Sequence, residues 1–253
     1  EKRAEAAIAK ASNIPDNKIL DFALPQNATL VKPKRSLNYL IASLAGLALP
    51  FLVMLITDFF NDRIVDLKEI GRKTRVPVIG TIGKNRYDTE LPTIEKPKST
   101  LTESFRGLRI NLQYLLQEPG KKVVSVTSTV VGEGKTFTAV NLAAIIAATG
   151  KKVLLLGLDL RKPRLHRLLG YTGTVGVSTY LIGQNTLEEI TFKSQVDSLF
   201  FCPSGPIPPN PAELLGSKRM DELVDWGKEN FDMVIVDSPP VAVVSDAFLI
   251  ARF

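Results

Sequence analysis

The chain has 253 residues, 45% of them hydrophobic, and a formal net charge of +6. This length fits one or two domains, with enough apolar material for a packed core. The positive excess fits a nucleic acid, an anionic membrane surface or a phosphate ligand equally well, so it selects none of these partners. The single cysteine, Cys202, excludes a disulfide within the chain.

The N-terminal region predicts a helix followed by a connector. Residues 1–12 are rich in Ala, Glu and Lys, which favours the end of a helix. Residues 13–33 are punctuated by Pro15, Pro25 and Pro33, and proline at this density favours extended backbone. The chain starts without a Met and stops inside an apolar run, so we expect it to be a fragment.

A long apolar segment, residues 36–60, predicts one transmembrane helix. Residues 36–57 carry no charge, and a helix of ~20 apolar residues crosses a ~30 Å hydrocarbon core. Tyr39, Phe59 and Phe60 lie near its ends, where aromatic side chains favour the membrane interface. A signal-peptide core is disfavoured by position and length, and a buried helix by the lack of a polar face. Basic residues are slightly more numerous after the segment, which favours a cytoplasmic C-terminal side.

Residues 61–98 are interpreted as a juxtamembrane segment and linker with one strand. Within them residues 62–75 predict a short polar helix and residues 76–82 the strand. A loop is expected over residues 83–99.

A further helix is predicted with Thr100 as its cap and Glu103, three residues later, as the capping-box partner. Its apolar side chains recur at helical spacing: Leu101, Phe105, Leu108, Leu112 and Leu115. On the same helix Glu103, Arg106 and Arg109 can form an exposed face with local ion pairs.

The remainder alternates between short apolar strands and helices. Strands are predicted at residues 123–128, 153–158, 199–203 and 233–236. Helices are predicted at residues 137–149 and from Pro211, with Asn210 as cap and Glu213 in the first turn. Around Trp226, Leu223 and Val224 a helix is expected to pack on the sheet. This pattern indicates an α/β domain with a mostly parallel sheet covered by helices on both faces.

The segment TVVGEGKT, residues 129–136, joins the first of these strands to a helix. Backbone N–H groups of such a turn and of the helix start bind phosphate oxygens. Lys135 would reach the terminal phosphates, and Thr136 would place its hydroxyl on Mg²⁺. Thr129 stands where the strict pattern has glycine, so an ordinary glycine-rich turn is the alternative.

Two aspartates follow buried strands. Asp159 directly follows the predicted strand at residues 153–158, and Asp237 directly follows the predicted strand at residues 233–236. Because the carboxyl ends of parallel strands meet at one edge, both are expected near the phosphate loop as oxygen donors for a metal ion. Each could instead cap a helix, less so Asp237, which precedes a Ser-Pro-Pro run.

The set GEGKT, LDLRKPRLH and VIVDSPP, with SGPIPPNP between them, resembles the bacterial tyrosine kinases, which are P-loop autokinases attached to polysaccharide co-polymerases. The resemblance covers nearly the whole chain. It implies four parts: residues 1–35, the end of a periplasmic co-polymerase domain and a Pro-rich connector; residues 36–60, the transmembrane helix; residues 61–98, the linker; and residues 99–253, a P-loop kinase domain truncated at its C-terminus.

The resemblance also implies residue roles for ATP and Mg²⁺. Arg161 is added to the catalytic set because it directly follows the strand end at Asp159. The catalytic set is Lys135, Asp159 and Arg161. The nucleotide-binding set is Gly132, Glu133, Gly134, Lys135, Thr136 and Phe137. The metal set is Thr136, Asp159 and Asp237, and the set that joins protomers is Glu103, Arg106 and Arg109.

The function implied is that of a membrane-anchored, ATP-dependent tyrosine autokinase that regulates the polymerisation or export of surface polysaccharide. Its partners would be further copies of itself in a ring that phosphorylate one another, the membrane, the export machinery and a protein-tyrosine phosphatase, with no nucleic acid. It would lie in the bacterial inner membrane, with the kinase domain cytoplasmic and the residues before the span periplasmic.

The chain departs from the family pattern at several points. Gly157 replaces the first aspartate of the Asp-x-Asp motif, so a role as base falls to Asp159 or is weakened. Val131 stands where proline is common. The five tyrosines form no C-terminal cluster.

Two other functions stay open. A partitioning or division-site ATPase would carry a lysine where Val130 stands. A co-polymerase scaffold would use the nucleotide site only to control assembly. A basic neighbourhood after the second strand is interpreted mainly as solvated surface: Lys151, Lys152, Arg161, Lys162, Arg164 and Arg167.

Overall fold

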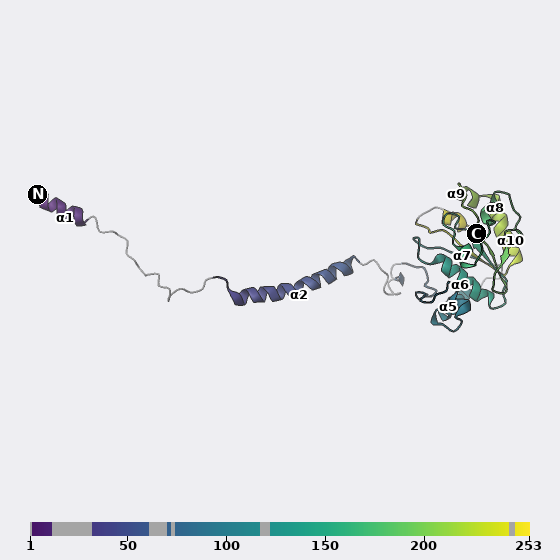
Figure 1. Cartoon of the computed structure of the whole chain (residues 1–253), viewed down its shortest axis with the longest axis horizontal. Helices are drawn as coiled ribbons and strands as arrows, with labels where there is room; N and C mark the ends of the chain where they lie inside the picture. The colour runs from purple at the N-terminus through teal and green to yellow at the C-terminus, as the bar shows by residue number, and fades with distance from the viewer. Residues whose placement is uncertain (1, 12–31, 61–69, 72–73, 117–121, 243–245) are drawn as a thin grey trace. The chain divides into compact units, whose positions relative to one another are not determined.

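The structure, a computed structural model, describes residues 2–11, 32–60, 70–71, 74–116, 122–242 and 246–253. The chain divides into two units, residues 1–74 and residues 75–253 (Figure 1).

The first unit contains the helices α1 (Lys2–Ala11) and α2 (Arg35–Phe59). Helix α2 confirms the long apolar helix expected at residues 36–60. Its mean hydropathy over the most apolar window is 2.4 and none of its residues is buried, so its length and composition suffice to cross a membrane. Pro50 lies inside it without ending it. The connector at residues 13–33 and the polar helix at residues 62–75 fall almost wholly outside the described residues.

The second unit is built on a five-stranded sheet with the order β1-β5-β2-β4-β3. The first four strands in this order run parallel, and β3 pairs antiparallel with β4. The bounds are β1 Lys122–Val126, β2 Val153–Gly157, β3 Phe192–Lys193, β4 Leu199–Cys202 and β5 Met233–Asp237. The parallel α/β prediction and its strands are confirmed; the edge strand β3 was not predicted, because it is only two residues long.

Helices cover both faces of this sheet, and alternate strand residues point to different layers. Leu155 of β2 packs into the layer formed with α4 (Pro92–Glu95), α5 (Thr100–Leu115), α6 (Lys135–Ala147) and α7 (Leu165–Leu168). Its neighbours Leu154 and Leu156 pack into the opposite layer. That layer is formed with α8 (Val177–Leu181), α9 (Pro211–Leu215), α10 (Lys218–Asn230) and α11 (Asp246–Ile250).

Several local predictions are corrected. Residues 76–82 form no strand: Ile79 and Ile82 pack against the core from an irregular segment, and the Ile79 carbonyl accepts a bond from Asn111 Nδ2 at 2.7 Å. Ile79 and Ile82 are thus used for packing rather than in a strand that pairs with the sheet. The loop expected over residues 83–99 contains α4.

The predicted helix caps also differ from the observed ones. Ser99, not Thr100, caps α5, because its hydroxyl accepts the Thr102 N–H at 3.1 Å. Asn210 holds the cap position of α9, but its side chain donates to Glu213 at 2.6 Å instead of accepting a backbone N–H. In α10, Leu223 and Val224 are buried and Trp226 packs against them, as expected.

Helix α5 packs along α6, the helix that starts at the phosphate loop (Figure 1). Phe105 of α5 is fully buried, and its ring lies 5.9 Å from that of Phe137 of α6, between centroids. The residues before the sheet therefore support the helix that carries Lys135 and Thr136.

We expect Phe105→Ala to lower the free energy of unfolding by about 3–5 kcal/mol, because it leaves a cavity between the two helices. Tyr114→Ala, at a side chain that is 68% exposed on the same helix, is the control and should change it by less than about 0.5 kcal/mol. Urea denaturation of both variants measures the difference. Equal losses would contradict the packing role of Phe105.

Candidate active site

The loop between β1 and α6 has the backbone that a phosphate cradle needs. Gly132 and Gly134 have φ values of 98° and 92°, which side chains other than glycine rarely adopt. Gly134 stands directly before α6, and its carbonyl accepts the Thr138 N–H at 2.8 Å. A Cβ at either glycine would meet nothing within 4 Å, so the cradle is open on the outside. The predicted strand–loop–helix arrangement is confirmed.

The Glu133 side chain braces this loop from within. Its Oε2 atom accepts the N–H of Thr129 at 2.8 Å and that of Val130 at 3.3 Å. The carboxylate thereby ties the start of the loop to its end. Among the predicted nucleotide-binding residues, Glu133 therefore has only its backbone N–H free to meet a phosphate.

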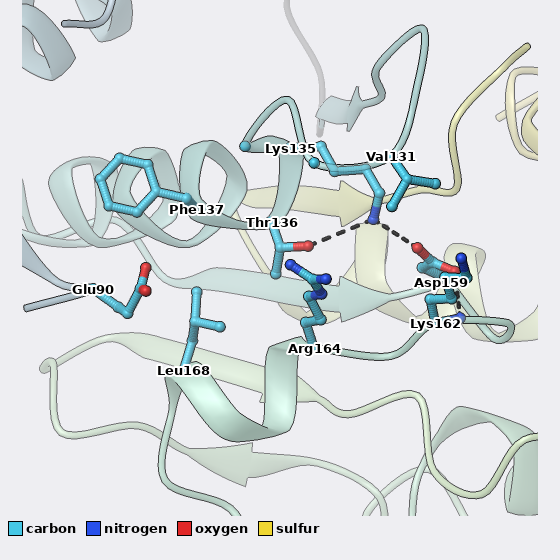
Figure 2. A pocket seen from close by; sticks show the side chains of 11 residues that line it. Glu90, Val131, Lys135, Thr136, Phe137, Asp159, Lys162, Arg164 and Leu168 are labelled. Carbon is cyan, nitrogen blue, oxygen red and sulfur yellow. Dashed lines mark hydrogen bonds and ion pairs between the residues drawn. The ribbon is translucent and has the colours of Figure 1, made fainter. Parts of the chain in front are cut away.

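Lys135, Thr136 and Asp159 come together at the carboxyl edge of the sheet (Figure 2). Asp237 joins this group through bonds with Lys135 and Thr136. Lys135 Nζ lies 2.7 Å from Asp159 Oδ2 and 3.4 Å from Asp237 Oδ1. Thr136 Oγ1 donates to Asp237 Oδ2 at 2.8 Å. β1, β5 and β2 are neighbours in the sheet, which is why residues 102 apart in the chain meet here.

Burial acts on the carboxyl group of Asp237 in this group. Asp237 is 1% exposed, and burial raises the pKa of its carboxyl group above the ordinary value. The charge of Lys135 and the hydrogen bond from Thr136 oppose that rise. An added cation at this place would favour the ionised carboxylate further.

The donors fit a magnesium-bound triphosphate. In the described part of the chain no cluster of three or more His, Cys, Asp or Glu side chains could hold a metal ion by itself. Mg²⁺ usually keeps several waters and takes few protein ligands beside phosphate oxygens. One hydroxyl, Thr136, beside two carboxylates, Asp159 and Asp237, meets that requirement.

A pocket opens from this group along α6, and Figure 2 shows its lining. Five of the six predicted nucleotide-binding residues line it, all except Glu133: Gly132, Gly134, Lys135, Thr136 and Phe137. The rest of its lining is Glu90, Val131, Asp159, Lys162, Arg164 and Leu168. Lys162 and Arg164 were interpreted as solvated surface, and no sequence signal pointed to Glu90, which reaches the pocket from the loop before α4.

Arg161, expected to act at the phosphates, lies elsewhere. Its guanidinium forms two bonds with the carboxylate of Asp246, through Nε at 2.6 Å and Nη2 at 3.1 Å. Asp246 is 1% exposed and begins α11. Hydrogen bonding to Asp246 raises the pKa of Arg161. The two bonds connect α11 to the segment after β2, and Arg161 does not line the pocket.

The glycine at position 157 is explained by Ser204, which follows the end of β4. A Cβ at Gly157 would lie 2.9 Å from Ser204 Oγ and 3.1 Å from Ser204 N. The space that an aspartate would need is therefore filled by Ser204, just past the end of β4. Of the two positions in the Asp-x-Asp pattern, only Asp159 presents a carboxylate here.

The residues predicted to join protomers lie on α5. Glu103 and Arg106 form an ion pair with each other, and Arg106 Nη2 also donates to the Pro97 carbonyl at 3.0 Å. Arg109 Nε is buried without a hydrogen-bond partner among the described residues. All three are thus separate from the phosphate pocket.

We expect Gly157→Asp to destabilise the protein by on the order of 2 kcal/mol, because the new side chain overpacks the β2–β4 contact and buries a charge. Gly83→Asp, where a Cβ would meet nothing within 4 Å, is the matched control. Urea unfolding midpoints compare them. If Gly157→Asp had the same unfolding midpoint as the control, Ser204 would have moved aside without loss of stability, which would contradict the prediction.

Comparison with known proteins agrees with this geometry. Residues 121–251 match the family model of the AAA domain. The tyrosine-protein kinase wzc of Salmonella typhimurium is 33% identical over 267 residues, which cover 99% of this chain and 37% of the relative. The tyrosine-protein kinase YwqD of Bacillus subtilis is 41% identical over 168 residues, covering 66% of this chain and 71% of the relative. The chain thus spans little more than a third of the length of the wzc protein it matches.

Solved structures are also similar to this chain. The chimerical protein CapA2B2 superposes with a TM-score of 0.70 at 34% identity, covering 74% of this chain and 81% of that one. The kinase domain of Escherichia coli tyrosine kinase ETK gives 0.68 at 31% identity, covering 74% and 76%. Because the match extends over most of YwqD and of both solved domains, the chain belongs to the bacterial tyrosine kinase family.

Proposed function

We propose that the protein is a membrane-anchored, ATP-dependent tyrosine autokinase that regulates the polymerisation or export of surface polysaccharide. The observation that carries the proposal is the group formed by Lys135, Thr136, Asp159 and Asp237 beside an open phosphate loop. Membership of the bacterial tyrosine kinase family supports phosphate transfer to tyrosine.

The chain's own residues suffice to bind and orient a triphosphate. The N–H groups from Gly132 to Thr136 surround the phosphate chain, and Lys135 Nζ neutralises its terminal oxygens. The hydroxyl of Thr136 and the carboxylates of Asp159 and Asp237 would hold Mg²⁺, which would supply charge neutralisation when bound. Transfer then depends mainly on positioning and charge stabilisation.

Asp159 is the base in this proposal. In the transfer the tyrosine oxygen forms a bond to the γ-phosphorus, the bond to ADP breaks, and the phenolic proton passes to an oxygen of Asp159. Asp159 Oδ1 accepts the Lys162 N–H at 3.0 Å and Oδ2 contacts Lys135, so its orientation is set by bonds to both oxygens. Gly157 leaves it without a second carboxylate in the motif.

We also propose that α2 spans the bacterial inner membrane, with the kinase domain cytoplasmic and the residues before the span periplasmic. The slight excess of basic residues after the helix supports this orientation. Membrane and export machinery would then be partners, together with a protein-tyrosine phosphatase that removes the modification. No nucleic acid partner is proposed.

Two alternatives use the same loop. A partitioning or division-site ATPase is disfavoured because Val130 replaces the lysine of that class, and its side chain is 49% exposed. A scaffold that binds nucleotide only to control assembly is favoured by Gly157, which removes one carboxylate from the motif. The products formed from ATP separate the three.

We expect the full-length gene product, incubated with ATP and Mg²⁺, to form phosphotyrosine, and Lys135→Met to lower the rate roughly 100-fold or more by removing the phosphate-binding cation. Immunoblotting for phosphotyrosine and release of free phosphate are measured together, with an added tyrosine-containing copolymer as acceptor. Free phosphate without phosphotyrosine would favour the ATPase. An oligomer change without either product would favour the scaffold.

We propose further that Glu103, Arg106 and Arg109 join protomers into a ring. The double change Arg106→Ala with Arg109→Ala is expected to lower the mass in solution, because it removes both cations of this helix face. Lys98→Ala with Lys84→Ala removes equal charge nearby and is the control. Light scattering measures the mass, and a double variant as large as the unmodified protein would contradict the role of α5.

A further inference from the structure

Arg164 is the feature of the phosphate pocket that neither the motifs nor the proposed roles use. It stands directly before α7, in the turn that follows β2 and Asp159. Its side chain lines the same pocket as Lys135 and Thr136. In Figure 2 its guanidinium group points from the floor of the pocket toward Thr136 and Lys135.

The side chain of Arg164 has no bonding partner within the described residues. No hydrogen bond, ion pair or ring contact of its guanidinium is found there, and the same holds for the amino group of Lys162. Arg161, three residues earlier, differs because Asp246 binds its guanidinium through two bonds. Arg164 is therefore free to bind an anion in the pocket.

The charges of the pocket favour such an anion near Arg164. Lys135 already contacts two carboxylates, Asp159 and Asp237, so this group carries an excess of negative charge when all three are ionised. A magnesium-bound triphosphate is itself anionic and would add to that excess. Arg164 and Lys162 are the lining cations that no carboxylate of the described residues neutralises.

The chemistry of transfer favours arginine at this place. A planar guanidinium donates parallel bonds to phosphate oxygens, which a lysine cannot do. Charge on the transferred group is spread over its three equatorial oxygens, and an arginine contacting them stabilises the transition state. Arg164 lines the same pocket as Asp159, the proposed base, so the transferred group would lie within the pocket that both residues line.

We propose that Arg164 is a further catalytic residue, which binds the γ-phosphate of ATP and stabilises it during transfer. The binding part depends only on the pocket, whereas the catalytic part rests on the proposed kinase function. Arg164 takes the role expected of Arg161 from the sequence. Lys162 adds charge to the same wall of the pocket.

Binding is tested with the full-length protein, Mg²⁺, ADP and a non-hydrolysable ATP analogue, by calorimetry. Arg164→Ala is expected to lower the affinity for the analogue roughly 10- to 100-fold, the range of one charge-assisted contact. The affinity for ADP, which lacks the γ-phosphate, should change less than about twofold. Arg164→Lys should recover part of the loss. Arg167→Ala, an exposed arginine on the same turn that does not line the pocket, should leave both affinities unchanged.

Turnover gives the second readout. With the tyrosine copolymer as acceptor, Arg164→Ala should lower kcat at least tenfold at saturating ATP, beyond its effect on KM. The role of Arg164 would be overturned if Arg164→Ala lowered the affinities for the analogue and for ADP equally. It would also be overturned if Arg164→Ala, like the control Arg167→Ala, changed neither nucleotide affinity nor kcat. If the unmodified protein makes no phosphotyrosine while Arg164→Ala still weakens the analogue alone, the kinase function fails and the γ-phosphate contact stands.

Discussion

The amino group of Lys135 bonds carboxylates from two neighbouring strands, at 2.7 Å to Asp159 and 3.4 Å to Asp237. Both carboxylates are almost fully buried, and a buried charge without a partner is strongly destabilising. Lys135 is therefore needed to neutralise these buried carboxylates, and its position is fixed because it is the first residue of α6. The loop, the strand order and the packing of α6 all serve to keep these three charges together.

The supports of this group come from both layers of the molecule. On one side Phe105 of α5 packs on Phe137 of α6, next to Thr136 in the chain. On the other, Arg161 binds Asp246 and connects α11 to the segment after β2, close to Asp159. Within the loop Glu133 binds the backbone of Thr129, which stands where the strict pattern has glycine. The departure at Thr129 therefore leaves the shape of the cradle intact.

The departure at Gly157 has a different consequence. Ser204 fills the space of a side chain there, so the residues just after β4 lie close against the end of β2. One carboxylate is lost from the motif, and Asp159 keeps bonds to Lys135 and to the Lys162 N–H. The guanidinium of Arg164, which has no bonding partner among the described residues, lines the same pocket as Lys135 and Asp159.

The sequence alone determined the parallel α/β domain, the apolar helix, the phosphate loop and the pairing of Asp159 with Asp237 at one sheet edge. These depend on local rules: apolar periodicity, glycine at positive φ, and strand ends that converge. The tertiary structure decided which neighbouring charges reach the pocket. Arg161 and Arg164 both follow the same strand, and the sequence does not distinguish them. In the fold, the Arg161 side chain binds Asp246, which is far away in the sequence, whereas the Arg164 side chain lines the pocket. The irregular path of residues 76–82 and the approach of Glu90 were also decided there, because packing against distant side chains outweighs a short local pattern.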